Sequence, residues 1–167
     1  PEPTLMTVSQ LYEPLTEHTR PATQADAGQI AGLLHQLGYL ASSELVSAKL
    51  RLLAANPHDA VLVAETDGRL AGVVSLHVLE LFHAEGRLGR ITSLVVDSVN
   101  RGKGTGRRLL QAADEYFLSC GCIRSEVTSG EHRSAAHAFY QAQGYRLDER
   151  RFVKQYSEPP LKRTSQP

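Results

Sequence analysis

A glycine-rich turn with basic residues, Arg101-Gly102-Lys103-Gly104-Thr105-Gly106, is the stretch of this sequence best suited to chemistry. It follows a β-branched apolar run, Ile91 to Val96, and precedes an apolar helical pattern that starts at Leu109. A strand, a glycine-rich turn and a helix in this order direct backbone N–H groups and the positive end of a helix dipole at an anion. The pattern therefore predicts a phosphate-bearing ligand at residues 101–106.

Two nucleotide-binding templates do not fit this turn. A Walker A loop that ended at Gly102-Lys103 would have Asp97 in place of its first glycine and Gly104 in place of its Ser/Thr. A dinucleotide fingerprint that began at Gly102 would have Arg107 in place of its third glycine. The turn is therefore neither of these loops.

A third pattern does fit. Arg101-x-x-Gly104-x-Gly106 resembles the Arg/Gln-x-x-Gly-x-Gly/Ala signature of the GNAT superfamily of N-acetyltransferases. A second segment, Ala136-x-x-Phe139-Tyr140-x-x-x-Gly144-Tyr145, resembles another motif of that family, Ala-x-x-Phe-Tyr-x-x-x-Gly-Phe/Tyr. The resemblance covers residues 20–156 in element order. The run around Arg133 and His137 resembles members that act on small molecules such as aminophosphonates or aminoglycosides.

The elements that must position these motifs follow from the hydrophobic periodicity and the turn residues. Gly86 and Gly89 are expected to flank a turn, and short links between the middle strands favour an antiparallel meander. With the resemblance, this order predicts an α+β (α/β mixed) GNAT-like fold, whose mostly antiparallel mixed sheet has about six to seven strands flanked by about four helices. The predicted strands are 18–21, 60–65, 70–79, 91–96, 123–127 and a pair or bent hairpin in 145–156; the predicted helices are 23–37, 42–53, 109–117 and 135–142.

The resemblance implies acetyl-CoA as co-substrate and assigns a binding surface for it. The N–H groups of residues 102–106 suit its pyrophosphate, and the backbone of strand residues 94–96 would bind the pantetheine and hold the thioester oxygen. Basic side chains of the turn add positive charge, although for Arg107 and Arg108 a solvated helix face is an equally good interpretation. The predicted cofactor-binding residues are Leu94, Val95, Val96, Arg101, Gly102, Lys103, Gly104, Thr105, Gly106, Arg107 and Arg133, the last of which replaces an Asn common in relatives.

Transfer to an amine needs an acid for the departing thiolate and a base for the amine. Tyr140 lies where relatives carry the tyrosine that acts as this acid, with core packing beside Phe139 as the alternative. Arg90 occupies the position at which some relatives carry a Glu base, and an arginine cannot act as one. Glu80 is ranked first as the base; the open alternatives are His77, His83 and water.

The overall composition and charge limit which classes of partner are expected. The chain has 167 residues, and its 18 Lys+Arg balance 18 Asp+Glu, so its charge implies no nucleic-acid partner. No apolar run approaches the length of a membrane span, and without a secretory leader a cytoplasmic location is expected. Cys120 and Cys122 are too close together for an ordinary structural disulfide or a four-ligand zinc site, and we expect no metal.

The sequence thus predicts a single acetyltransferase domain at residues 17–157, between a flexible extension at 1–16 and a polar tail at 158–167. Its predicted reaction is acetyl-CoA-dependent N-acetylation of a primary amine of a small molecule, by direct attack in a ternary complex. The alternatives are a non-catalytic acyl-CoA-binding or sensing module and an acetyltransferase acting on a protein or peptide amine. An exposed edge strand near the C-terminal end could pair into a homodimer.

Overall fold

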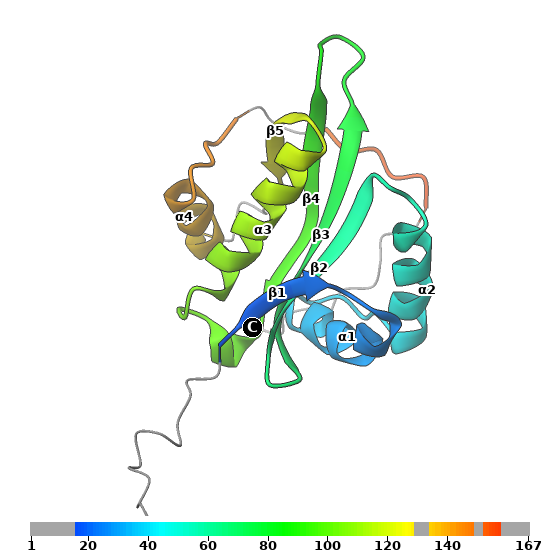
Figure 1. Cartoon of the computed structure of the whole chain (residues 1–167), viewed down its shortest axis with the longest axis vertical. Helices are drawn as coiled ribbons and strands as arrows, with labels where there is room; N and C mark the ends of the chain where they lie inside the picture. Colours follow the sequence, from blue (N-terminus) through cyan, green and yellow to red (C-terminus); the bar gives the residue numbers. More distant parts are fainter. Residues whose placement is uncertain (1–15, 129–133, 149–151, 158–167) are drawn as a thin grey trace, which may run out of the picture.

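The computed structural model describes residues 16–128, 134–148 and 152–157. In that part of the chain a five-stranded sheet lies between two helical layers (Figure 1). The strands are β1 (His18–Pro21), β2 (Asp59–Thr66), β3 (Arg69–Glu80), β4 (Arg87–Val96) and β5 (Cys122–Val127). The helices are α1 (Ala27–Gln36), α2 (Ser43–Ala54), α3 (Thr105–Ser119) and α4 (Ser134–Ala142). The predicted α+β class and meander are confirmed.

The strands follow the chain order β1-β2-β3-β4-β5 across the sheet. The first four are antiparallel, and β5 pairs with β4 in parallel because α3 returns the chain to the same end. The β3–β4 ladder has one irregularity: Ser75 pairs with Ser93 and Leu76 with Ile91. Thr92 is therefore an extra residue in β4, a β-bulge that bends the strand at its middle.

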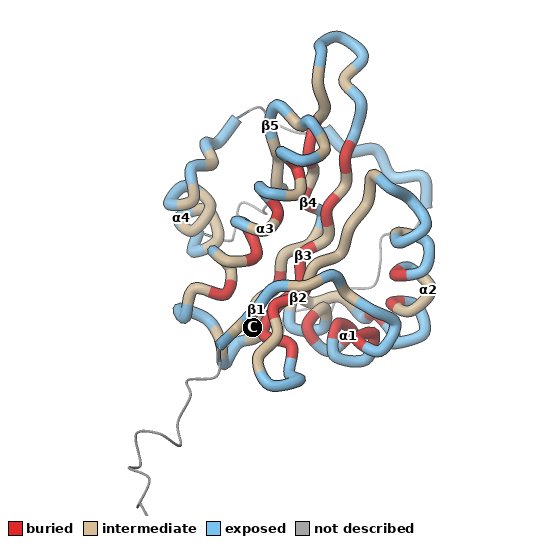
Figure 2. Tube along the Cα trace, viewed as in Figure 1, coloured by how far each residue is buried: buried red, intermediate tan, exposed pale blue. Residues whose placement is uncertain are grey.

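Two hydrophobic cores lie on opposite faces of the sheet. On one face α1 and α2 cover Val63, Val73 and Val95; on the other α3 packs over residues such as Val74 and Leu76, which are fully buried. Figure 2 shows the buried residues along the middle of the sheet and on the helix sides that face it. Successive side chains along β3 and β4 point to opposite faces of the sheet, as the period of two of an extended strand requires.

The first strand and first helix are joined by an ion pair. The guanidinium of Arg20 donates to both carboxylate oxygens of Asp26, at 2.8 and 2.9 Å, and Nε donates to Glu65 on the neighbouring strand. Asp26 is 4% exposed and also accepts from the amide of Thr23 at 2.7 Å, which closes a capping box. The hydrogen bond from Arg20 is the main cause that holds the pKa of Asp26 below its usual value.

Two details of the predicted sheet are wrong in the described residues. The structure describes five strands, not six to seven, and residues 145–148 and 152–157 are not strands. Leu147, Phe152 and Tyr156, which would have to pack against a sheet, are at least 85% exposed. Gly89 lies inside β4 and not at a turn. A Cβ at this position would lie 2.6 Å from the ring of Phe117 on α3. Glycine is therefore needed at position 89 for close approach of α3 to the sheet.

The predicted extension and polar tail fall outside the described residues, apart from position 16. Within the described residues, no helix is both long and apolar enough to span a bilayer.

Candidate active site

The edge of β4 that faces β5 is closed along its first half and open along its second. The parallel ladder ends at the pair Ile91–Val127, while β4 continues to Val96. Backbone N–H and C=O groups of an extended strand point alternately to its two sides. Part of the backbone polar groups of residues 92–96 therefore faces a gap, with no β5 partner among the described residues. An extended, amide-bearing ligand can pair with such an edge.

The side chains of the three predicted residues in this segment, Leu94, Val95 and Val96, have different surroundings. Val95 is 4% exposed and belongs to the core beneath α1 and α2, whereas Leu94 packs against the core on the α3 face. Val96 is half-buried, and its carbonyl accepts from Nε of Arg101 at 3.4 Å. What all three residues can offer a ligand at the open edge is therefore their backbone.

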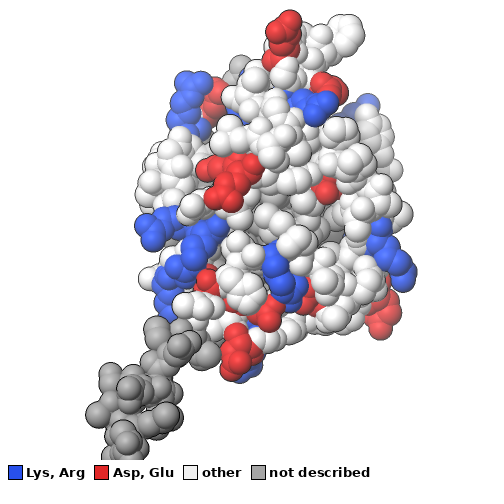
Figure 3. Space-filling view, in the orientation of Figure 1, with Lys and Arg blue, Asp and Glu red and all other residues white. Residues whose placement is uncertain are grey.

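The glycine-rich turn follows directly and leads into α3. Gly102 and Gly104 have positive φ angles of 75° and 85°, a conformation that residues with a Cβ rarely adopt. The amide of Arg108 is bonded to the carbonyl of Gly104 at 3.0 Å. The amides of the first helical residues before it have no acceptor within the helix, so they point out of its N-terminal end. Figure 3 shows Lys and Arg side chains gathered over this end of α3.

The structure adds one acidic residue that the sequence did not indicate. Glu17 accepts from the hydroxyl of Thr105 at 2.7 Å and from Nε of Arg108 at 2.7 Å. Thr105 is 1% exposed, so its side chain is committed to Glu17 and only its amide is available to a phosphate. Arg108 is likewise tied down, whereas Arg101, Lys103 and Arg107 are exposed. No local pattern identifies Glu17, because 88 residues separate it from Thr105.

The two sequence motifs meet where α4 crosses the start of α3. A Cβ at Gly106 would lie 3.0 Å from Cζ of Phe139 and 3.6 Å from Cγ2 of Val96. The absence of a side chain at position 106 therefore lets the Phe139 ring rest on the first turn of α3. The neighbouring residue, Tyr140, packs with Phe139 against the core on the α3 face of the sheet.

Tyr140 is half-buried among aromatic rings. Its ring centroid lies 5.3 Å from that of Phe139 and 5.7 Å from that of Tyr145, the latter in an edge-on arrangement. Gly144, with φ of 89°, ends α4 and turns the chain so that the amide of Tyr145 bonds the carbonyl of Tyr140 at 3.0 Å. Tyr145 shares a hydrogen bond of 3.1 Å with Ser125, and burial raises the pKa of its phenol.

The structure places the base candidates far apart. Glu80 ends β3 with a side chain 71% exposed, and it bonds Nε of Arg87 at 2.5 Å. His83 is exposed in the β3–β4 hairpin. His77 lies closer to the bulge, between Asp59 at 2.8 Å (Nδ1 to Oδ1) and Thr92 at 2.8 Å (Nε2 to Oγ1). Ser75 is the β3 residue beside the bulge, and Glu80 comes five residues after it. At the usual rise of a strand, these two residues are about 16 Å apart.

Arg133 lies outside the described residues, so the structure does not place it. Cys120 and Cys122 are free thiols at the far end of α3, and burial raises the pKa of Cys122. In the described residues no cluster of three or more His, Cys, Asp or Glu is arranged to hold a metal ion.

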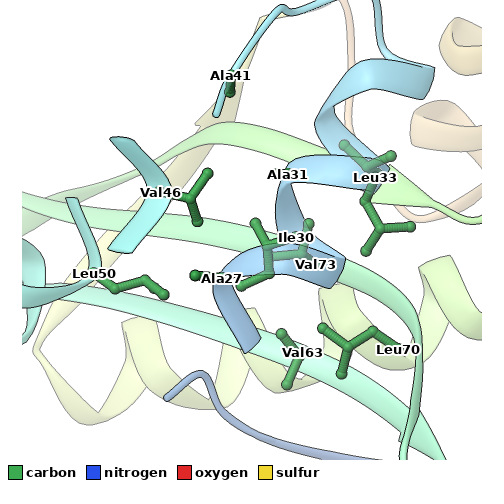
Figure 4. Packing of buried hydrophobic residues seen from close by; sticks show 11 residues of the cluster. Ala27, Ile30, Ala31, Leu33, Ala41, Val46, Leu50, Val63, Leu70 and Val73 are labelled. Carbon is green, nitrogen blue, oxygen red and sulfur yellow. The ribbon is translucent and has the colours of Figure 1, made fainter. Parts of the chain in front are cut away.

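A cavity of about 150 Å³ lies on the other face of the sheet, between α1, α2 and the strands. Figure 4 shows Ile30, Val46 and Val73, which contribute to its walls, converging from α1, α2 and β3. Ser75 and Ser93 line it from the two strands that flank the bulge. The cavity thus lies on the face of the sheet opposite to the one that α3 covers.

Comparison with known proteins gives consistent results. The family model described as the acetyltransferase (GNAT) family matches residues 29–145. The aminoalkylphosphonate N-acetyltransferase of Salmonella typhimurium is 31% identical over 140 residues, which cover 81% of this chain and 88% of that protein. Glucosamine 6-phosphate N-acetyltransferase 1 of Oryza sativa subsp. japonica is 36% identical over 112 residues, covering 63% of this chain and 68% of that protein.

Solved structures share the fold at lower sequence identity. The glucosamine-6-phosphate N-acetyltransferase of Arabidopsis thaliana superposes with a TM-score of 0.75 at 22% identity, over 85% of this chain and 99% of that one. An aminoglycoside N-acetyltransferase in complex with CoA gives a TM-score of 0.74 at 18% identity, over 85% of this chain and 96% of that one. At these identities the likeness concerns the fold alone.

Proposed function

The chain belongs to the GNAT acetyltransferase family and is an N-acetyltransferase, and we propose that it moves an acetyl group from acetyl-CoA directly to a primary amine of a small molecule. The reaction forms a C–N bond and breaks the thioester C–S bond; the amine loses one proton and the departing thiolate gains one. The observation that carries the proposal is the continuity of the open β4 edge with the glycine turn at the start of α3.

The donor side uses mainly backbone groups. Acetyl-CoA supplies the activated acetyl group, and the amides of residues 102–106 bind its pyrophosphate with help from exposed Arg101 and Lys103. The open backbone of residues 94–96 pairs with the pantetheine amides. One amide of this edge stabilises the negative charge that develops on the thioester oxygen, because it is already oriented before the reaction begins. Arg107 is exposed near the phosphates and adds charge only.

On the acid side, Tyr140 donates the proton that the departing thiolate needs. The contact of Phe139 with Gly106 supports this role, because it fixes α4 against the donor site. Glu80 is not part of the proposal, since its carboxylate is bonded to Arg87 at the exposed end of the hairpin. Burial raises the pKa of the Cys122 thiol, which makes it a poor nucleophile and supports direct transfer without an acetyl-cysteine.

The test is release of CoA thiol from acetyl-CoA across a panel of primary amines. Tyr140→Phe is expected to lower kcat about 100-fold with unchanged acetyl-CoA affinity, the usual range for loss of a general acid. Tyr145→Phe is the matched control, since it removes the neighbouring phenol and its bond to Ser125 and is expected to leave kcat nearly unchanged. Acetyl-CoA binding without turnover of any amine would favour the acyl-CoA-binding module instead.

Binding of the donor has its own test. Gly104→Asp introduces a Cβ at a φ of 85° and a negative charge beside the pyrophosphate, and it is expected to weaken acetyl-CoA binding at least tenfold, roughly 1.4 kcal/mol. Gly68→Asp carries the same charge and a similar strain, at φ of 73°, in the β2–β3 turn away from the site. Equal acetyl-CoA affinity of the two variants by calorimetry would contradict the assignment of the turn.

We also propose that the protein forms a homodimer through the edge of its sheet. β5 is an edge of the described sheet, and Ile123 on it is 60% exposed. An edge strand with unpaired backbone groups and an exposed apolar side chain can pair with a second copy. Sedimentation equilibrium over a range of protein concentrations tests this, and a monomer at all concentrations would contradict it.

A further inference from the structure

The residues that line the cavity between α1, α2 and the sheet favour some classes of amine over others. Its walls are almost entirely apolar, formed by residues such as Leu34, Leu45 and Val61. The polar side chains among its lining residues are Ser75 and Ser93, both at the bulge of β4, and Lys49 of α2, which is exposed. The cavity therefore has an apolar body and a hydroxyl-bearing end, and that end adjoins the β4 edge assigned to the donor.

From this arrangement we infer that the cavity is the acceptor site and that it takes a monoamine with a small alkyl or aryl body. This inference rests on the proposed function. An apolar cavity of about 150 Å³ is large enough for a benzene ring, and the amine would then lie at the serine hydroxyls. No carboxylate is among the lining residues of the described chain, so a polycationic acceptor would find no counter-charge. Among the described lining residues a phosphate or phosphonate would find one cation, Lys49, whereas such dianions are normally held by several donors.

Benzylamine is the probe, with 2-aminoethylphosphonate and glucosamine 6-phosphate as competitors. The expected result is a kcat/KM for benzylamine at least about tenfold above that of either anionic amine, the discrimination typical of a matched apolar pocket. Two exposed leucines of α2 form a matched pair: Leu45 lines the cavity and Leu52 does not. Leu45→Ala is expected to lower kcat/KM for benzylamine about fivefold, and Leu52→Ala to leave it unchanged.

Calorimetric titration of benzylamine in the presence of CoA separates this inference from the proposed function. Binding that is weakened by Leu45→Ala but not by Leu52→Ala, without turnover of any amine, would uphold the cavity and refute the transfer. Turnover that favours the anionic amines, or equal behaviour of the two leucine variants, would refute the cavity as the acceptor site and uphold the transfer.

A hydrogen-bond chain, which is a separate observation, supports a second inference that rests on the cavity being the acceptor site. Asp59 Oδ1 accepts from His77 Nδ1 at 2.8 Å, His77 Nε2 lies 2.8 Å from Thr92 Oγ1, and Thr92 Oγ1 lies 2.7 Å from Ser75 Oγ. Asp59 thereby holds the His77 proton on Nδ1 and leaves Nε2 to accept. The chain runs from a carboxylate on β2 to a cavity-lining hydroxyl on β3, through the bulge residue of β4.

The geometry points to this chain as the route by which the acceptor amine loses its proton. An ammonium at the cavity end gives a proton to the Ser75 hydroxyl, Ser75 passes its own to Thr92, and Thr92 passes its own to His77 Nε2. His77 becomes an imidazolium beside the Asp59 carboxylate, and its 23% exposed side chain returns the proton to water. Each hydroxyl takes up one proton and releases one, so both remain neutral, and rotation of the two O–H bonds returns the chain to its starting direction.

The charged groups nearest this route, besides Asp59, are one residue on the neighbouring strand and one that lines the cavity. Arg90 on β4 is opposite His77 in register and bonds Glu126 of β5 at 2.6 Å. Lys49 is the titratable residue that lines the cavity from α2.

The test is the pH dependence of kcat/KM for the best amine of the panel. His77→Gln keeps a hydrogen-bonding side chain but cannot take a proton, and it is expected to lower kcat/KM at pH 7 about 100-fold. The loss should disappear near pH 10, roughly the pKa of an alkyl ammonium, because the amine then supplies its own neutral form. Ser75→Ala should show the same pH-dependent loss, and His83→Gln, in the exposed hairpin, should show none.

Two outcomes would overturn the proton route while leaving the acetyl transfer intact. An equal loss at every pH would mean that the chain only holds the bulge in shape, and no loss at any pH would mean that another group takes the proton. The acetyl-CoA affinity of each variant, measured in parallel, reports whether the donor site is still folded.

Discussion

A single methyl group at position 106 tests whether the two sequence motifs act as one unit. The methyl of Gly106→Ala would lie 3.0 Å from Cζ and 3.4 Å from Cε2 of Phe139, closer than the ordinary carbon separation of about 3.5 Å. Overpacking of this kind costs about 1–3 kcal/mol. Alanine in a helix gains about 1 kcal/mol over glycine. The net free energy of unfolding should therefore fall by about 0–2 kcal/mol.

Gly32→Ala supplies the control, because Gly32 lies inside α1 with nothing within 4 Å of its would-be Cβ. This variant should gain about 0.5–1 kcal/mol of stability. The two variants make the same chemical change, so their difference isolates the contact with Phe139. The measurement is urea denaturation, with the midpoints compared at an unchanged slope.

Activity gives the second readout of the same variant. If the methyl pushes Phe139 away, α4 moves with it and Tyr140 is displaced from the position proposed for the acid. A misplacement of this order lowers kcat about 10- to 100-fold, while the amides proposed to bind acetyl-CoA stay where they are. The reasoning is refuted if Gly106→Ala is stabilised as much as Gly32→Ala and keeps its kcat.

Three further predictions concern groups outside the transfer chemistry. Glu17→Gln weakens the acceptor of Arg108 at the start of α3 and should destabilise the fold by about 1–3 kcal/mol in urea denaturation. The ion pair with Arg20 holds the pKa of Asp26 below its unfolded value. The stabilisation from this pair is therefore present when the pH is above the unfolded pKa, and it is lost as the pH falls through the folded pKa. The Asp26→Asn variant should be less stable than the native protein at pH 7, and the two stabilities should converge in acid. Cys122→Ser should keep full activity, and mass spectrometry of the native protein with acetyl-CoA should show no acetyl adduct on Cys122, because burial raises the pKa of its thiol.

The sequence predicted the features that depend on neighbouring residues. Strand His18–Pro21 has the predicted bounds, and the helix after the glycine turn and the strands before it lie where periodicity and turn residues indicated. The two motifs could be recognised for the same reason, since each is a short run whose glycines or aromatics serve one local geometry. The confirmed family and enzyme class follow from these runs.

The features that the sequence did not predict are contacts between distant segments. Glu17 reaches α3 across 88 residues, and the Asp59–His77 pair forms only because β2 and β3 are in one particular register. Gly89 looked like a turn residue because its real partner, the ring of Phe117, comes 28 positions later. Likewise Glu80 and His77 are alike in sequence terms, both near the end of the same strand, and only the register separates an ion-paired carboxylate from a linked imidazole.

The bulge at Thr92 explains how one strand can serve both substrates. Without the extra residue, β4 would continue flat beside β5, and its remaining N–H and C=O groups would have a partner to pair with. With it, the β5 ladder ends at Ile91, one residue before the bulge, and in the part of the chain that the structure describes residues 92–96 have no β5 partner, which leaves their edge to the proposed donor. The same extra residue puts the Thr92 hydroxyl between Ser75 and His77 on the face that carries the cavity. Opening the donor edge and linking the acceptor cavity to a proton acceptor are thus two consequences of one inserted residue, on the two sides of a single strand.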